Sequence, residues 1–336
     1  MPSNINAIVV GAGKFGRHYV RILSRLNAES HLGIPPINRL IITRTKRSAA
    51  ESMARQMMRD PLCRVSEVIG TRVRNARELE DLARSFAPVF ICITARDPAA
   101  GDDIHAAYTL AALPWGPVLC EKPFCHAAGD GQSLSRLQAL EAAAGPSRFG
   151  LELPMAVVAR HIRRSPAVAP LWRRPRHMVF LWQIPAPGKV DILDDLALHP
   201  WSLLPADYRI DTVAAAAAGS ARRIELTLVH AKHGDACECR IMLQPGGTFR
   251  KVTVDGSAIG IHREKDAVEL IPIDRGPATN GRARREAPLL RVDNPLKENI
   301  VALLRGKPLI DAASTHRSQL FLERLHGYVP GEHESG

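Results

Sequence analysis

Long apolar segments are missing from this sequence. No apolar run of the 336-residue chain approaches the roughly 20 residues that a helix needs to cross a bilayer. The strand-like run at residues 5–10 is preceded by neither a basic segment nor a small-residue cleavage site, so no secretory leader is indicated. We therefore expect a cytoplasmic protein that has no membrane partner.

Cysteines are also few. The chain has 6, and several lie in apolar runs, as Cys92 and Cys120 do. This placement is typical of buried thiols in a reducing compartment rather than of a disulfide framework. Cys237 and Cys239 are two residues apart in a predicted strand, so both point to one face. Because no second Cys or His pair at zinc-like spacing accompanies them, we predict no metal site.

Acidic residues are outnumbered by basic ones. The 45 Lys and Arg against 34 Asp and Glu give a net charge of +11, which favours anionic ligands. The net charge is the only feature of the sequence that favours a nucleic-acid partner. The basic residues are scattered, aromatic residues make up 5 %, and no RNA- or DNA-binding motif is present. We expect a small-molecule partner and no nucleic acid.

The first third of the chain alternates short apolar strands with helical patterns. Strands are predicted at residues 7–10, 39–43, 89–94 and 118–120, and helices at 15–26, 48–58, 77–85 and 103–113. Such alternation is typical of a parallel sheet with helices on both faces. The fold class predicted here is α/β, with a doubly wound Rossmann sheet.

The pattern changes after about residue 150. Strands are predicted at 177–183, 222–230, 237–243, 249–254 and 267–271, and helices at 194–204, 295–304 and 314–325. Gly-Gly and Asp-Gly pairs mark turns between strands, which indicates an α+β domain with a largely antiparallel sheet. We therefore predict a Rossmann domain at 1–123, a second domain at 124–330 that serves substrate binding and oligomerisation, and a disordered tail at 331–336.

A glycine motif follows the first predicted strand and opens the first helix. Gly11, Gly13 and Gly16 form G-x-G-x-x-G, with Lys14 and Phe15 between the last two glycines. In this context the motif is typical of dinucleotide binding: the first glycine permits a tight turn, the second lets the backbone approach the pyrophosphate, and the third lets helix and strand pack closely. The helix N-terminus then presents N–H groups to the phosphates.

The end of the second strand distinguishes the two nicotinamide dinucleotides. NAD enzymes usually place an acidic residue there for the ribose 2′-hydroxyl. This chain has Thr43 and Arg44, then Arg47, and no carboxylate among them. The two guanidinium groups suit a 2′-phosphate, so we predict that NADP(H) is preferred over NAD(H). The alternative is a solvated basic turn without a ligand.

Two further motifs carry a family resemblance. Glu121-Lys122-Pro123 follows the strand at 118–120, and Asp195 precedes His199 by four residues in the second domain. Together with the glycine motif, they resemble the glucose-fructose oxidoreductase / inositol dehydrogenase / MocA (Gfo/Idh/MocA) family, whose members have Glu-Lys-Pro and Asp-x-Gly-x-His in this order. The resemblance implies cofactor contacts from Thr94, Glu121 and Lys122, catalysis by Lys122, Asp195 and His199, and a homo-oligomer, a dimer or tetramer formed through the open sheet face.

The chemistry of these three residues supports the same roles. Hydride transfer to or from carbon requires a proton to be moved at the attached oxygen or nitrogen, and an imidazole titrates in the right range. Asp195 lies one helical turn before His199, where it can hold substrate or orient the ring. Lys122 ends a parallel strand at the carboxyl edge, where ligands bind. Whether Lys122 or His199 moves the proton stays open.

Simpler interpretations exist for the same residues. Asp195 and His199 can be a surface pair on a helix, with Asp194 the more exposed acid, and Lys122 can be an ordinary solvated lysine. His105, on the predicted helix 103–113, is interpreted as a packing or capping residue.

The chain also departs from the family pattern. Thr94 is followed by Ala95 rather than by the family's Pro-Asn, and a glycine-rich lead into the Asp/His motif is replaced by residues 189–194. The leading interpretation is an NADP(H)-dependent oxidoreductase acting on a small carbonyl or hydroxyl substrate that is sugar- or polyol-like. The alternatives are a biosynthetic imine or ketone reductase, which these departures permit, and a non-catalytic NADP(H)-binding redox sensor.

Overall fold

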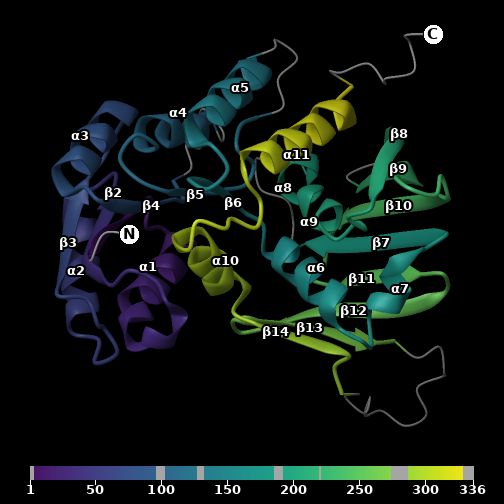
Figure 1. The fold of residues 1–336 in the computed structure, drawn as a ribbon, viewed down its shortest axis with the longest axis horizontal. Coiled ribbons are helices and arrows are strands. Elements are labelled where there is room, and N and C mark those ends of the chain that lie inside the picture. The colour runs from purple at the N-terminus through teal and green to yellow at the C-terminus, as the bar shows by residue number, and fades with distance from the viewer. Residues whose placement is uncertain are drawn as a thin grey trace. The chain divides into compact units, whose positions relative to one another are not determined.

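The computed structural model describes residues 4–95, 103–126, 132–184, 192–218, 221–273 and 287–327. The chain divides into two compact units, each with its own sheet (Figure 1). The first unit contains residues 1–152 and 296–319, and the second contains residues 153–295 and 320–336.

The sheet of the first unit has six strands, all parallel, in the order β3-β2-β1-β4-β5-β6. This is the Rossmann strand order, with the switch point between β1 and β4. The strands are β1 Ile5–Val10, β2 Ile37–Arg44, β3 Glu67–Arg72, β4 Val89–Ile93, β5 Val118–Glu121 and β6 Phe149–Glu152. The predicted doubly wound parallel sheet is confirmed, although β3 and β6 were not predicted.

Helices from two parts of the chain belong to the first unit, wholly or in part. They are α1 Gly16–Arg25, α2 Arg47–Met58, α3 Ala76–Phe86, α4 Asp103–Ala112, α5 Gln132–Ala144, α10 Pro295–Leu304 and α11 Ala312–Leu325, with short 3₁₀ turns at Leu26–Ala28 and Ser30–Leu32. Helix α11 begins in the first unit and ends in the second.

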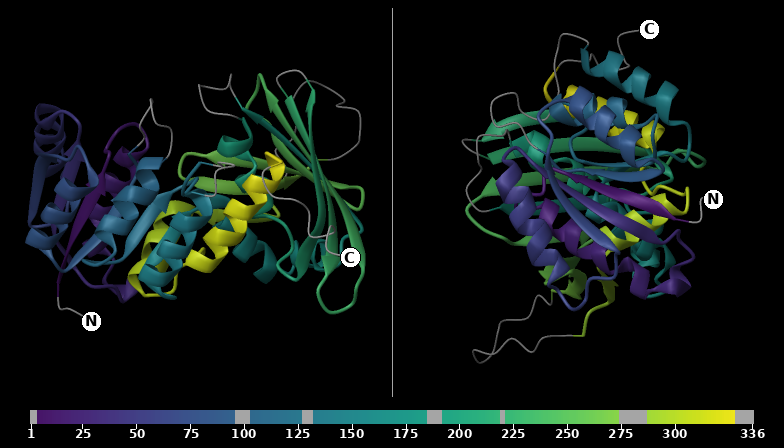
Figure 2. Two further views of the ribbon diagram at one scale, coloured as in Figure 1. Left: turned by 90° about the horizontal axis from the view of Figure 1, so that it is seen from above. Right: turned by 90° about the vertical axis from the view of Figure 1, so that its left-hand side faces the viewer.

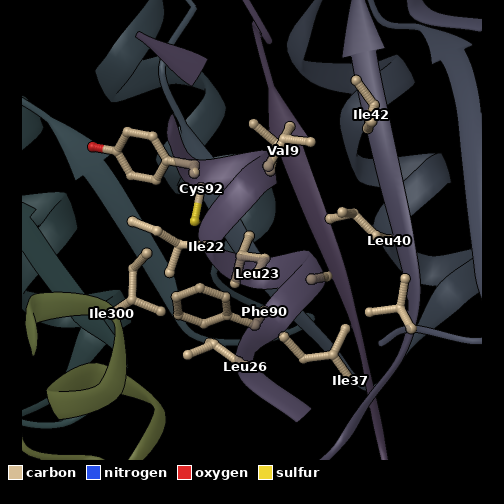
Figure 3. Packing of buried hydrophobic residues seen from close by; sticks show 14 of the residues in the cluster. Val9, Ile22, Leu23, Leu26, Ile37, Leu40, Ile42, Phe90, Cys92 and Ile300 are labelled. Carbon is tan, nitrogen blue, oxygen red and sulfur yellow. The ribbon is translucent and has the colours of Figure 1, made fainter. Parts of the chain in front are cut away.

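The core of the first unit lies between the sheet and the inward face of α1. Ile22, Leu23 and Leu26 are buried there, as their spacing predicts, and Figure 3 shows them beside Phe90 of β4. Ile300 of α10 belongs to the same cluster. A helix from the end of the chain therefore completes the core of the N-terminal unit.

The second unit contains an eight-stranded sheet in the order β14-β13-β12-β11-β7-β10-β9-β8 (Figure 2). Only β7 and β10 pair in parallel among these neighbours, so the prediction of a largely antiparallel sheet is confirmed. The strands are β7 His177–Ile184, β8 Tyr208–Ala218, β9 Ala221–His230, β10 Ala236–Pro245, β11 Arg250–Val254, β12 Ser257–Glu264, β13 Ala267–Pro272 and β14 Leu290–Asp293. The helices that lie wholly in this unit are α6 Pro154–Arg164, α7 Ala169–Arg173, α8 Ile192–Leu196 and α9 Leu198–Trp201.

One predicted turn is a tight hairpin. Val254 pairs with Ser257, and Asp255 and Gly256 between them have φ of 45° and 88°. Positive φ at both central residues is the geometry of a type I′ turn, which Asp-Gly favours. The hairpin fixes the register of β11 against β12.

The units differ from the predicted domains. The sequence placed a boundary at residue 123, whereas α5, β6 and residues 296–319 group with the first unit. The reason is that β6 pairs with β5 and α10 supplies core residues. The predicted disordered tail, 331–336, lies outside the described residues.

Within the described residues, neither a membrane span nor a metal cluster is found. No helix among them is long and apolar enough to span a membrane. No group of three or more His, Cys, Asp or Glu side chains in the described ranges is placed to hold a metal ion. All six cysteines are free thiols, and five of them are buried.

Candidate cofactor and active site

The glycine motif forms the turn between β1 and α1. Gly11 has a φ of 84°, and a Cβ there would lie 2.3 Å from the Cα of Ala95. A Cβ on Gly16 would lie 2.7 Å from both the carbonyl oxygen of Gly11 and Oγ1 of Thr94. A Cβ on Gly13 would meet only the Gly11 oxygen, at 3.8 Å. Two glycines are therefore required by packing, and the middle one leaves open space at the loop.

That space is where a pyrophosphate would fit. Lys14 and Phe15 are exposed beside it, and the first turn of α1 follows directly. The loop therefore fits a dinucleotide phosphate.

Thr94 braces this loop from the neighbouring strand end. Its Oγ1 lies 2.9 Å from the carbonyl oxygen of Gly11 and 3.1 Å from that of Val10, and its backbone N–H also donates to Val10. The side chain is buried, so its observed role is to hold the loop.

Basic residues gather at the end of β2. Thr43 is buried, and its carbonyl oxygen accepts a hydrogen bond from Ala12 at 3.0 Å, which ties the strand end to the glycine loop. Arg44 is half-buried, and it pairs in register with Arg72 of β3. Sequence reasoning missed Arg72 because it missed β3.

Arg47 has an acidic neighbour. It begins α2, and its Nε lies 2.8 Å from Oε1 of Glu51, one helical turn on. The Arg47 side chain is 73 % exposed, so this contact is a weak surface ion pair that a bound phosphate can replace.

Lys122 follows the last residue of β5 and is only 6 % exposed. It is therefore not the solvated lysine of the simpler interpretation. The preceding Glu121 accepts a hydrogen bond from Tyr19 Oη at 2.5 Å. Burial, together with the nearby carboxylates Glu121 and Glu152, raises the pKa of Tyr19 well above its usual value. Glu121 thus links β5 to α1.

His105 fixes the segment on the other side of Lys122. It is fully buried in α4, and its Nδ1 lies 2.8 Å from the carbonyl oxygen of Pro123. Since a carbonyl only accepts, Nδ1 carries the proton in this contact. His105 is a packing residue, as interpreted from the sequence, and it also positions the turn that follows Lys122.

Asp195 and His199 lie in the second unit, on α8 and α9. The single helix predicted at 194–204 is two short helices, separated at Ala197, whose φ of −60° and ψ of −30° are still helical. Pro200 has no N–H to donate to the turn before it, which explains the interruption. The four-residue spacing therefore still places both side chains on one side of a nearly continuous helix.

The neighbouring acid, Asp194, has a different role from the one expected in the surface-pair interpretation. That interpretation made Asp194 the more exposed acid, which is wrong: Asp194 is 6 % exposed and Asp195 is half-buried. Asp194 Oδ1 lies 3.0 Å from Nε2 of His326, the residue that directly follows α11. Asp194 thus anchors α8, and Asp195 is the acid nearer to solvent.

His199 is held by an aromatic stack. Its ring lies 5.8 Å from that of Trp182 on β7, with 9° between the planes. Lys122 belongs to the first unit and these residues to the second, so the structure brings Asp195 and His199 together within one unit but does not by itself group them with Lys122.

The fold and the loop geometry define a dinucleotide-binding Rossmann protein, and similarity to known proteins specifies its class. Residues 5–145 match the GFO_IDH_MocA family model, described as "Oxidoreductase family, NAD-binding Rossmann fold". The resemblance predicted from the sequence is confirmed for residues 5–145, which carry the Rossmann domain of the Gfo/Idh/MocA oxidoreductase family. This match supports an NAD(P)-dependent oxidoreductase.

Solved structures share the fold over nearly the whole chain. UDP-N-acetylglucosamine 3-dehydrogenase GnnA from Acidithiobacillus ferrooxidans is 16 % identical, covers 97 % of both chains and superposes with a TM-score of 0.60. Levoglucosan dehydrogenase in its apo form is 12 % identical, with the same coverage and a TM-score of 0.64. An oxidoreductase domain protein from Kribbella flavida is 15 % identical over 97 % of both chains, with a TM-score of 0.67. Among curated proteins, none matches the chain.

Proposed function

We propose that this protein is an NADP(H)-dependent dehydrogenase or reductase whose substrate is a small carbonyl or hydroxyl compound of sugar-like character. The observation that carries the cofactor preference is the end of β2, where Arg44 and Arg47 are present and neither Thr43 nor any residue up to Ser48 is acidic. Arg72, in register with Arg44, adds a third guanidinium group at the same edge of the sheet.

An acidic residue is nevertheless close, because Glu51 pairs with Arg47. The proposal therefore depends mainly on Arg44, whose nearest charged neighbour in the sheet register is another arginine. A 2′-phosphate there would be attracted by two cations, whereas NAD(H) offers only a hydroxyl.

For catalysis we propose Lys122, Asp195 and His199. Bound NADP(H) supplies or accepts the hydride. The imidazole of His199 or the ammonium of Lys122 moves a proton at the oxygen or nitrogen on the reacting carbon, and Asp195 holds substrate or orients His199. The stack on Trp182 limits rotation of the His199 ring, which keeps its nitrogens aimed.

The sugar-like substrate rests on similarity. Levoglucosan dehydrogenase has been solved with NADH and levoglucosan and with NADH and L-sorbose, at 13 % identity to this chain in each case. Reduction of an imine or ketone is the second candidate, which Ala95 permits in place of the family's Pro after Thr94. The predictions of a cytoplasmic location and of a dimer or tetramer stay predictions.

The cofactor experiment is calorimetric titration of the full chain with NADPH and with NADH. We expect NADPH to bind at least about tenfold more tightly, equivalent to about 1.4 kcal/mol. Arg44→Ala should erase most of this preference, and Arg39→Ala, an arginine of the same strand paired with Glu67, serves as the matched control. Equal affinities in the wild type, or a preference unchanged by Arg44→Ala combined with Arg47→Ala, would overturn the assignment.

The activity experiment is a screen of sugars, polyols, ketones and imines with NADPH or NADP⁺, followed by the absorbance of the reduced nicotinamide. Turnover of a sugar or polyol supports the leading candidate, and turnover confined to imines or ketones supports the second. Cofactor binding without turnover of any compound would favour a redox sensor.

A further inference from the structure

Trp182 is buried on one face of the eight-stranded sheet, called here the covered face. It has a second neighbour on that face. Arg250 of β11 pairs with Trp182 in the strand register, and its guanidinium carbon lies 5.4 Å from the centre of the indole ring. The ring of His199 stacks on the same indole at 5.8 Å. The proposed acid/base and this guanidinium therefore share one aromatic neighbour within one unit.

The charge of Arg250 is not compensated by the part of the chain that the structure describes. No carboxylate or carbonyl there accepts a hydrogen bond from it, and its Nε is buried without a partner. Burial, and after it repulsion from Arg263, lowers the pKa of Arg250, and no acid contributes. An arginine stays protonated nonetheless, so an unpaired positive charge lies half-buried beside Trp182.

Several other arginines of the same sheet form ion pairs with acidic residues. Arg291 forms ion pairs with Glu269 and Asp293, and Arg240 forms one with Glu225. The cation–π contact with Trp182 offsets part of the cost of burying Arg250. It leaves the buried Nε–H of the guanidinium without an acceptor. Nε1 of Trp182 is a second buried donor without a partner among the described residues.

A buried donor and a half-buried charge without partners are costly, and a ligand that supplies the acceptors removes this cost. A guanidinium offers two parallel N–H groups that match a carboxylate or phosphate. We propose that Arg250 recognises an anionic group of the substrate, foremost a carboxylate, on the covered sheet face beside Trp182 and His199. This inference rests on the proposed function, and it narrows the sugar-like substrate to an acidic one such as a sugar acid.

The test is calorimetric titration of the NADP⁺-saturated full chain with D-gluconate, D-glucitol and D-glucitol 6-phosphate. Gluconate and glucitol differ only in the group at one end, a carboxylate or a neutral alcohol. We expect gluconate to bind at least tenfold more tightly than glucitol. Tighter binding of the phosphate than of the carboxylate would still assign the anion site to Arg250 and would change only the anionic group.

Three variants make the assignment specific. Arg250→Gln should erase the preference for the anion, and Arg250→Lys should keep only part of it, because lysine lacks the paired N–H geometry. Arg209→Gln, which removes an exposed arginine of β8, is the matched control and should behave as the wild type. A preference that survives Arg250→Gln, or a wild type that binds all three compounds equally or none of them, would overturn the proposal.

Failure of the proposed NADP(H)-dependent function and failure of the proposed role of Arg250 give different results. NADPH and NADP⁺ affinities are measured in the same four proteins before the sugars are added. Loss of NADP(H) binding by the wild type contradicts the proposed function. Normal cofactor binding without a preference for the anionic compounds contradicts only the role of Arg250.

Discussion

The hydroxyl of Tyr19 donates a hydrogen bond to Glu121 at 2.5 Å, which joins the helix after the glycine loop to the strand that ends before Lys122. The two residues are 102 positions apart in the sequence. Both elements that carry the cofactor site and the lysine are thereby held in one geometry. Tyr19 is 1 % exposed and Glu121 is half-buried, so the bond is partly shielded from water.

Tyr19→Phe should therefore destabilise the protein. It leaves the Glu121 carboxylate without its donor, a loss of about 1–3 kcal/mol in the free energy of unfolding. The raised pKa of Tyr19 gives a direction with pH: the contribution of the neutral phenol is complete below about pH 10 and declines above it. Urea denaturation at pH 7.5 and pH 10.5 measures both effects, and Tyr19→Phe should lack part of the alkaline decline.

Tyr208→Phe is the matched control. The Tyr208 hydroxyl is buried without a hydrogen-bond partner among the described residues, so its removal should be neutral or slightly stabilising. Equal destabilisation by the two substitutions would show that the bond between Tyr19 and Glu121 contributes nothing specific.

The glycine loop gives a second prediction. Gly13→Val places its branched side chain in open space, so the fold should survive while NADPH binding is lost. Gly16→Ala places a Cβ against Gly11 and Thr94, so it should lower the free energy of unfolding. Thermal unfolding and calorimetry with NADPH separate the two effects. Normal NADPH affinity in folded Gly13→Val would place the dinucleotide elsewhere.

Thiol reactivity gives a third prediction. Cys63 is the one partly accessible cysteine of the six, and the other five are buried. Burial raises the pKa of Cys237 to about 12, so its reactive thiolate is scarce at neutral pH. Ellman's reagent at pH 8 should modify one thiol rapidly in the native protein and all six in denaturant. Cys63→Ser should abolish the rapid phase, and two or more rapid thiols in the native wild type would contradict the burial of the others.

The sequence predicted the elements whose patterns are strong and missed those whose signals conflict with their environment. Residues 7–10 of β1 and all of β4 are continuous apolar runs, and both strands were found. β3 was missed because Gly70 interrupts it and its apolar residues are few; the glycine is needed because a Cβ would lie 2.4 Å from the backbone of Glu51. β8 was missed because residues 214–218 are all alanine, which favours helix. Pairing with β9 overrides that preference.

The site shows the same division. The glycine motif and Lys122 are local signals, and the sequence located both. The partners of these residues are not local: Tyr19 reaches Glu121, and His326 reaches Asp194 across 132 positions. Arg250 gave no signal at all, since it is one of 45 basic residues, and only the strand register places it beside Trp182.

The last prediction concerns the proposed catalytic residues. Removing a positioned acid or base typically lowers turnover by about 10²–10⁴. Lys122→Ala and His199→Ala should each lose turnover by that order while still binding NADPH. Asp195→Ala should weaken substrate binding, turnover or both, according to whether Asp195 holds substrate or orients His199. His177→Ala, which removes an exposed histidine of β7, is the control and should leave turnover unchanged.

The double variant and the pH profile decide how the two residues act. Members of one catalytic unit are not additive, so Lys122→Ala with His199→Ala should be little worse than the worse single variant. If His199 moves the proton, the limb of the kcat/KM profile near pH 6–7 should vanish in His199→Ala and persist in Lys122→Ala. If Lys122 moves it, that limb should persist in His199→Ala, and Lys122→Ala should show the larger loss of kcat. Full turnover in both single variants would contradict the catalytic assignment and leave the resemblance to the family as one of fold and cofactor alone.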